Sequence, residues 1–495
     1  MSRRFSKIFL LASLALSLSA CTAEPTVQNS QPTQEVSLHD GDSYTLTAQE
    51  VVKTIEEKQV KMFAYNGSIP GPTLRIPQGA SIALNLINQT PIPTLLHSHG
   101  VRMKSEFDGT HLVQDPIQLG ESFKYELDFP DAGVYWYHPH LREDYAQEMG
   151  LYGLFIVEPS DPDYWNPADR EVALVIDDIL MTENGIAPFS DIVDHALMGR
   201  YGNTFLVNGD TDYSMDAVAG EILRFHLLNA SSARPYRLVL PDLPMKLVGS
   251  DGGKLEQEQF ESELILSPSE RATVEVLFSE PGTYALLNET PQSTQVLTSI
   301  EVSGENVATS KVEEFSKLRI NEGLLAEFKP YRDRLNTAPD KILRLSMDMG
   351  HGGMAMMDMG SSEKIEWEDE MGMMNAHMTT DMVTWKLVDE QTGKVNEDID
   401  WSFQRGEIIK IRLINDPSST HPMQHPIHIH GQRFLVLATN GVATDNLAWK
   451  DTALVQTGDT VDLLVEMSNP GQWMLHCHIS EHLESGMSLA FSVKE

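Results

Sequence analysis

The segment Gly79-Ala-Ser-Ile-Ala-Leu-Asn-Leu-Ile-Asn88 alternates apolar side chains with other residues and ends in an asparagine nine positions after its first glycine. The same pattern recurs in Gly220–Asn229 and in Gly406–Asn415. Alternation with a period of two residues indicates a strand with one buried face, and a terminal asparagine is typical of a turn. Three widely spaced copies of one strand indicate a chain built from internal repeats.

A second repeated feature follows each copy. In each repeat, a glycine or serine is followed 13 residues later by a glycine that opens an aromatic or apolar strand. The pairs are Gly120 and Gly133, Ser269 and Gly282, and Gly458 and Gly471. We therefore predict an all-β protein of three similar Greek-key β-sandwich domains. A helix is expected only around 312–328, in the connector near 306–340. The predicted domains cover residues 36–160, 165–305 and 340–495.

The composition narrows the class of protein. The chain has 495 residues, 41% of them hydrophobic and 22% charged, which is typical of a globular protein. Its 36 basic and 72 acidic residues give a formal net charge of −36, so a nucleic-acid partner is excluded. There are two cysteines, Cys21 and Cys477, which is too few for a disulfide framework.

The N-terminus is typical of an export signal. Arg3, Arg4 and Lys7 precede a short apolar run over 8–20, which is too short to span a bilayer as a permanent helix. The run ends in Leu-Ser-Ala before Cys21, which resembles a bacterial lipobox. We expect a signal peptide over 1–20, a lipidated tether over 21–35 and a location on the periplasmic side of a bacterial envelope. A plain cleaved signal with a chance cysteine is the alternative, and the export route stays open.

Histidine pairs distinguish the repeats. The first and third repeats carry H-x-H pairs at matching positions, and the second carries none. On a strand, an H-x-H pair directs both rings to one face. A lone histidine is usually structural, whereas four repeat-related pairs indicate metal ligands that converge between the first and third domains. The pairs are His97 with His99, His138 with His140, His428 with His430, and His476 with His478.

The last pair encloses the one cysteine beyond the N-terminal region. Cys477 lies near His425, His482 and Met487 in the sequence. Two histidines, a cysteine thiolate and a distant axial methionine form the blue-copper arrangement for electron transfer. Zinc also accepts two histidines and a cysteine, but it is redox-inactive and leaves the eight-histidine cluster unexplained.

These motifs, together with Asn66-Gly67-Ser68-Ile69-Pro70-Gly71-Pro72-Thr73, resemble the multicopper oxidase family over essentially the whole mature chain. The resemblance implies cupredoxin-like domains and four coppers of types 1, 2 and 3. Electrons would enter at type 1 and reduce O₂ to water at the other three. The implied ligands are His425, Cys477, His482 and axial Met487 for type 1; His97 and His428 for type 2; His99, His138 and His478 for one type 3 copper; and His140, His430 and His476 for the other.

The resemblance also implies carboxylates that serve the cluster. Asp108, in Phe107-Asp108-Gly109, resembles the family's proton-relay carboxylate, although a turn aspartate before glycine is the simpler interpretation. Glu481 and Glu484 flank the positions where some members carry a second carboxylate, so neither is assigned. Asp451 is either a partner that orients a type 1 histidine or a plain strand-edge residue.

A methionine-rich insert at about 347–382 holds 11 of the chain's 23 methionines, interleaved with glycine, aspartate and histidine. Soft thioethers select Cu(I), and similar inserts occur in bacterial copper-efflux oxidases. We expect a monomeric oxidase that uses O₂ and Cu(I), with an extra copper at the insert. The alternatives are a laccase-like oxidase of small organic reductants and a non-catalytic copper-sequestering lipoprotein. His39, His111, His195, His226 and His421 are expected to be structural or surface residues.

Overall fold

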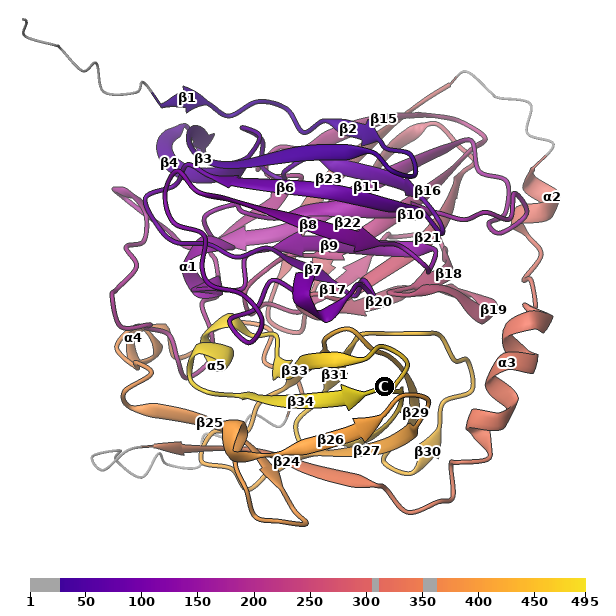
Figure 1. Ribbon diagram of the computed structural model, residues 1–495. Helices are drawn as coiled ribbons and strands as arrows, with labels where there is room; N and C mark the ends of the chain where they lie inside the picture. Colours follow the sequence, from indigo (N-terminus) through magenta and orange to yellow (C-terminus); the bar gives the residue numbers. More distant parts are fainter. Residues whose placement is uncertain (1–26, 305–310, 350–362) are drawn as a thin grey trace, which may run out of the picture.

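The computed structural model describes residues 27–304, 311–349 and 363–495. Strands dominate it, and short helices lie at its edges (Figure 1), so the predicted all-β fold is confirmed. The expected signal peptide and Cys21 lie outside the described residues. Within the described ranges, no helix is long and apolar enough to cross a membrane.

The first domain consists of two sheets of five strands each. One sheet contains β1 (Gln28–Asn29), β3 (Ser43–Ile55), β4 (Lys58–Tyr65), β6 (Ser81–Asn88) and β8 (Ser122–Asp128). The other has the order β2 (Glu35–Ser37), β5 (Thr73–Pro77), β10 (Gly153–Glu158), β9 (Gly133–His138) and β7 (His97–His99).

The second domain packs a sheet of six strands on one of five. The larger has the order β14 (Thr204–Val207), β11 (Arg170–Ile179), β16 (Glu221–Asn229), β21 (Arg271–Phe278), β18 (Met245–Ser250) and β19 (Gly253–Glu261). The smaller has the order β15 (Ser214–Val218), β23 (Thr294–Ser303), β22 (Gly282–Glu289), β17 (Tyr236–Val239) and β20 (Glu263–Leu266), and a separate hairpin pairs β12 (Met181–Thr182) with β13 (Gly185–Ile186).

The third domain repeats this plan. Its larger sheet has the order β25 (Val383–Asp389), β24 (Lys341–Met349), β27 (Ile408–Asn415), β32 (Thr460–Glu466), β29 (Arg433–Thr439) and β30 (Val442–Ala443). Its smaller sheet has the order β26 (Trp401–Gln404), β34 (Ser488–Lys494), β33 (Gly471–Cys477), β28 (His425–Ile429) and β31 (Thr452–Val455).

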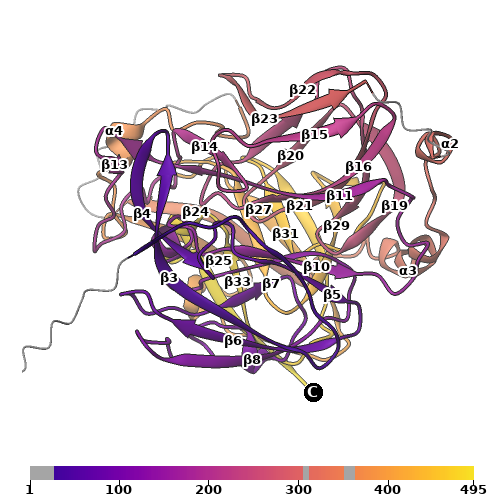
Figure 2. The ribbon, with the colours of Figure 1, turned by 90° about the horizontal axis from the view of Figure 1, so that it is seen from above.

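The repeated segments of the sequence take equivalent places in the three domains. The first pattern forms β6, β16 and β27, and each of these strands has one parallel and one antiparallel neighbour in its sheet. The second pattern opens β9, β22 and β33. The first and third domains share one continuous apolar core, which includes Cys477 and Met487. In Figures 1 and 2 the third domain, orange to yellow, lies against the first, indigo to purple.

Two local expectations need correction. The predicted helix around 312–328 is two helices, α2 (Val312–Phe315) and α3 (Glu322–Arg332). The helix is interrupted because Ile320 forms a β-bridge with Gln257 of the second domain. The expected tether over 21–35 is partly structured, since β1 pairs with β3. The remaining helical segments are α1 (Glu143–Ala146), α4 (Gly372–Asn375), α5 (Ser480–Glu484), η1 (Ser105–Phe107) and η2 (Asn396–Asp398).

Gly431 closes β28 against the core and generates a stability prediction. Its φ is 64°, and a Cβ there would overlap the buried indole ring of Trp473. Gly431→Ala should therefore lower the free energy of unfolding by more than the about 1–3 kcal/mol that backbone strain alone costs. Gly441→Ala is the matched control, because its φ is 77° and no atom of the described residues lies within 4 Å of its Cβ position. Denaturant unfolding of the metal-free variants measures the difference, and equal losses would contradict the packing argument.

Candidate metal centre

The histidine pairs lie where the first-domain sheet that contains β7 and β9 faces the smaller sheet of the third domain. His97 is paired across the sheet with His138 by β7 and β9, and His428 with His476 by β28 and β33. Strand alternation then directs the second ring of each pair to the same face. All eight rings are buried, and His140 is the most exposed at 5%. Rings from different domains stack, with centroids 3.6 Å apart for His99 and His428.

The structure brings the predicted ligands together in distinct groups. Within each group, one donor atom of every residue lies within 4.8 Å of the others. The groups are His97, His99 and His428; His99, His138 and His478; His140, His430 and His476; and His425, Cys477 and His482.

Backbone hydrogen bonds orient four of the eight rings. His97 Nδ1 donates to Asp108 O at 2.8 Å, His138 Nδ1 to Pro139 O at 2.9 Å, and His428 Nδ1 to Asp451 O at 2.8 Å. Their Nε2 atoms are buried, and no hydrogen-bond partner is present within the described residues. Buried nitrogens without partners are costly, so inward lone pairs of this kind fit a bound cation.

Cys477 forms a separate group with two histidines. Its Sγ lies 3.6 Å from Nδ1 of His425 and 3.7 Å from Nδ1 of His482. Met487 is fully buried, and its carbonyl oxygen accepts the Cys477 N–H at 3.1 Å. Burial raises the pKa of the Cys477 thiol, so its thiolate needs a cation beside it. A thiolate with two imidazoles, hydrogen-bonded through its backbone to a buried methionine, fits copper.

Asp108 is fully buried between histidines of two domains. Its Oδ2 accepts the Nδ1–H of His430 at 2.9 Å, while its backbone carbonyl holds His97. Its Oδ1 has no hydrogen bond within the described residues, although it lies 3.3 Å from Nδ1 of His97. Asp108 therefore fixes two rings and keeps one oxygen for a proton or a water.

Asp451 serves a different histidine from the one expected. It accepts the Nε2–H of His99 at 2.9 Å, and within the described residues it forms no hydrogen bond or ion pair with His425 or His482 of the cysteine group. The expectation that it orients a type 1 histidine is therefore wrong. The reason is that Asp451 precedes β31, whose first residue lies opposite His428 in the cluster.

Sequence reasoning missed one carboxylate of the cluster. Glu143, on α1, is 1% exposed, and its Oε1 lies 3.4 Å from Nε2 of His140. Its position three residues after His140 was the available signal. Glu481 is equally buried, and burial raises the pKa of both carboxyl groups well above their usual range.

The described part of the methionine-rich insert lies against the second domain. Residues 350–362 are outside the described residues, whereas 363–382 lead into β25. Arg234 donates to Trp367 O at 2.9 Å, and Ala196 N–H donates to Met378 O at 2.9 Å. Met371 and Met378 pack against the core that contains Cys477, and Met373 is 90% exposed.

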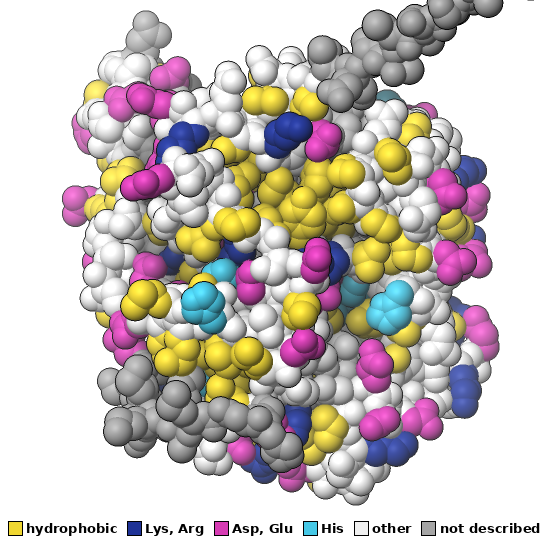
Figure 3. Space-filling model, turned by 90° about the vertical axis from the view of Figure 1, so that its left-hand side faces the viewer, with side chains coloured by type: hydrophobic (Ala, Val, Ile, Leu, Met, Phe, Trp, Pro, Cys, Tyr) yellow, Lys and Arg dark blue, Asp and Glu magenta, His cyan; other side chains and the backbone are white. Residues whose placement is uncertain are grey.

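The end of the insert leads directly to the cysteine group. Trp385, in β25, stacks on His482 with ring centroids 4.1 Å apart and donates its Nε1–H to Ala196 O of the second domain. On the side of the molecule that carries α1 and α4, hydrophobic side chains gather on a hollowed surface (Figure 3).

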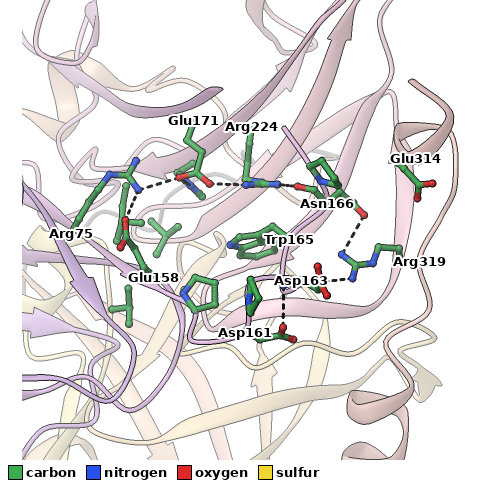
Figure 4. Close-up of a pocket in the computed structure, with 18 of the residues that line it drawn as sticks. Arg75, Glu158, Asp161, Asp163, Trp165, Asn166, Glu171, Arg224, Glu314 and Arg319 are labelled. Atoms are coloured by element: carbon green, nitrogen blue, oxygen red, sulfur yellow. Dashed lines mark hydrogen bonds and ion pairs between the residues drawn. The ribbon is translucent and has the colours of Figure 1, made fainter. Parts of the chain in front are cut away.

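A separate pocket of about 740 Å³ lies between the first and second domains (Figure 4). Its charged groups neutralise one another: Glu171 pairs with Arg75 at 3.1 Å and with Arg224 at 2.6 Å. None of the grouped histidines lines this pocket, so it is distinct from the metal centre.

The buried histidines predict acid sensitivity of the metal-free protein. Burial lowers the pKa of His425 to about 3 and that of His476 to about 4, from an ordinary 6.5. Below pH 6.5 the unfolded chain therefore binds more protons than the folded one, and stability is lost as the pH falls toward those folded-state values. Between pH 6.5 and 5, each such histidine should lower the free energy of unfolding by up to about 2 kcal/mol. Denaturant unfolding of metal-free protein at several pH values measures this, and a stability that is flat or rises on acidification would contradict it.

Comparison with known proteins agrees with this geometry. Family models described as multicopper oxidase match residues 47–162 and 366–495. The multicopper oxidase mco of Staphylococcus epidermidis is 26% identical over 453 residues, which cover 90% of this chain and 87% of the relative. The multicopper oxidase MmcO of Mycobacterium tuberculosis is 24% identical over an alignment of 533 positions, which covers 98% of this chain and 96% of the relative.

Solved structures show the same likeness. The multicopper oxidase from Campylobacter jejuni, described as a metallo-oxidase, superimposes with a TM-score of 0.71 and 26% identity over 96% of this chain and 99% of that one. Lac15 from a marine microbial metagenome gives a TM-score of 0.64 and 27% identity over 91% and 99%. With the histidine groups and the buried thiol in place, these matches identify the chain as a copper-dependent oxidoreductase that belongs to the multicopper oxidase family.

Proposed function

We propose that this multicopper oxidase oxidises Cu(I) to Cu(II). The observation that carries the proposal is the place of the insert: Met371 and Met378 pack on the core around Cys477, and the chain then runs to Trp385, which stacks on His482. Thioethers are the ligands that Cu(I) prefers. The insert therefore offers soft donors beside the group through which electrons would enter.

The resident coppers are assigned to the groups that the structure assembles. We propose that His425, Cys477, His482 and Met487 would hold type 1 copper. Bound copper supplies one-electron transfer and the reduction of O₂, so four Cu(I) ions, four protons and one O₂ give four Cu(II) ions and two waters. The remaining sets are His97 and His428 for type 2, and His99, His138 and His478, with His140, His430 and His476, for the type 3 pair.

The chain's own residues would carry electrons and protons between these sites. Cys477 is joined by peptide bonds to His476 and His478, which belong to the two type 3 groups. It is therefore a short covalent path from the type 1 group to the cluster. Asp108 contacts His97 and His430, and one of its carboxylate oxygens has no hydrogen bond within the described part of the chain, so we propose that it passes protons to the cluster.

The role of Cys477 is tested by Cys477→Ser. The hydroxyl cannot replace the soft thiolate, so the variant should lose its blue absorption and its oxidase activity. The eight-histidine cluster should still bind copper, because no ring of it depends on the sulfur. Visible absorption, metal analysis and O₂ uptake measure these properties. A variant that stays blue would refute the type 1 assignment, and one that still oxidises Cu(I) would refute the path through Cys477.

The substrate is tested by replacing thioethers without removing the insert. A variant with leucine at Met371, Met373, Met374 and Met378 keeps the apolar volume and loses four soft donors. We expect kcat/KM for Cu(I) to fall about tenfold or more, equivalent to about 1.4 kcal/mol, while oxidation of a small phenol stays level. Met62→Leu, at a position 2% exposed in the first domain, is the matched control. An unchanged Cu(I) rate would sink the proposal, and an equal fall for both substrates would indicate a structural insert.

A phenol oxidase is the second candidate, favoured by one observation. A pocket of about 770 Å³ has a mixed lining, in which polar groups such as Lys61 and Asp191 accompany the apolar and aromatic side chains of Leu141, Tyr145 and Phe189. Tyr145 belongs to α1, which packs on α5, and α5 carries His482. An aromatic reductant in this pocket would lie on the side of the molecule where α5 holds a type 1 ligand. The phenol measurements on the methionine variant distinguish this candidate from Cu(I) oxidation.

A further inference from the structure

Arg271 is a residue of the second domain that reaches the other two. It begins β21, and its side chain is fully buried. Its Nε–H donates to Val134 O of the first domain at 2.9 Å, and its Nη1–H donates to Asp451 Oδ1 of the third domain at 2.7 Å. A second bond joins Nη2 to the other oxygen of Asp451. The guanidinium thus holds the carboxylate in a forked pair, which fixes its orientation as well as its place.

The same carboxylate determines which nitrogen His99 presents to the cluster. Asp451 Oδ1 accepts the Nε2–H of His99 at 2.9 Å, and Thr452 Oγ1 lies 3.1 Å from that nitrogen. His99 therefore directs Nδ1 inward, where it has no hydrogen-bond partner within the described residues. His97 and His428 direct Nε2 inward, because the Nδ1–H of each donates to a backbone carbonyl. His99 has a carboxylate in place of a carbonyl, so its orientation depends on whatever holds that carboxylate.

A buried carboxylate can do this only if its charge is balanced. Asp451 is 3% exposed, and Arg271 is the cation in contact with it within the described residues. The neighbouring Lys450 forms ion pairs with two carboxylates of the second domain instead, since its Nζ lies 3.0 Å from Asp251 and 3.1 Å from Glu270. Removing one partner of a buried ion pair leaves an uncompensated charge, which is strongly unfavourable.

Gly100 shows that the chain leaves room for this pair. It follows His99 directly with a φ of 81°. A Cβ at this position would overlap Asp451 Oδ2 and would lie 2.9 Å from Nη2 of Arg271. The glycine after the first histidine pair is thus required by the close approach of the forked ion pair as well as by its backbone conformation.

We infer that Arg271 is a positioning residue for the type 3 site. Through Asp451, the second domain, whose repeat carries no histidine pair, sets the ring orientation and the inward nitrogen of His99. The inference rests on the proposed assignment of His99 as a type 3 ligand. Partners that orient metal-bound histidines typically change metal affinity by about 10- to 100-fold when they are removed.

The test compares Arg271→Gln with a matched buried arginine. Arg224 lies on the adjacent strand β16, is 4% exposed and pairs with Glu275 of β21, but it contacts none of the proposed ligands. Cu(II) affinity of the histidine cluster is measured by competition with a chelator. Electron paramagnetic resonance reports on the coupled pair, because two coupled Cu(II) ions are silent and a broken pair is not.

We expect Arg271→Gln to lower the cluster's affinity by about 10- to 100-fold and to produce a new paramagnetic copper signal, with the blue absorption of the Cys477 group retained. Arg224→Gln should lose stability but keep both cluster properties. If Arg271→Gln does not fold, Arg271→Lys replaces it, because lysine keeps the charge but cannot form the forked pair, and it should shift both properties in the same direction.

His99→Ala separates the two levels of the argument. If His99→Ala loses cluster copper while the arginine variants match the wild-type protein in affinity and in resonance spectrum, the positioning role of Arg271 is overturned and the ligand assignment stands. If His99→Ala also matches the wild-type protein, the ligand assignment itself is wrong and the inference falls with it. If Arg224→Gln changes the cluster as much as Arg271→Gln does, the effect is general destabilisation, which also overturns the inference.

Discussion

Eight histidine rings are buried between the first and third domains, and this burial determines how the groups around them must be arranged. Each imidazole has two nitrogens, and in the absence of water both need partners. His97, His138 and His428 give one N–H to a backbone carbonyl that the strands hold in place. The second nitrogen then has a single available direction, toward the other rings. A cation completes what the protein leaves unsatisfied, so the fold and the metal centre stabilise each other.

The acceptors explain why the domains are fixed so closely together. Asp108 of the first domain holds His430 of the third, and Asp451 of the third holds His99 of the first. Each carboxylate therefore crosses the interface, and the two domains also share a continuous apolar core. Displacing one domain would break hydrogen bonds on both sides of the cluster and expose apolar surface, which resists relative motion at the site.

The middle domain supplies none of the grouped histidines, but it contacts the residues that hold them. Its repeat has Leu287-Asn288-Glu289 where the others have histidine pairs. It contributes Arg271 to the cluster side, and it anchors the insert through Arg234 and the segment around Ala196. Both are contacts of buried or half-buried polar groups across a domain boundary, which specify one arrangement.

The strand pattern and the metal chemistry are determined by the sequence alone. A period of two in Gly79–Asn88 and its repeats reflects local backbone geometry, and H-x-H spacing directs both rings of a pair to one face whatever surrounds the strand. The tertiary structure decided which groups face those rings. The bond from Asp451 to His99 joins residues 352 positions apart, Arg271 arrives from another domain, and Ile320 interrupts a helix by bridging to Gln257. Such contacts form only when distant segments pack together in the folded chain. The residue pattern within one segment carries no information about which other segment it will contact.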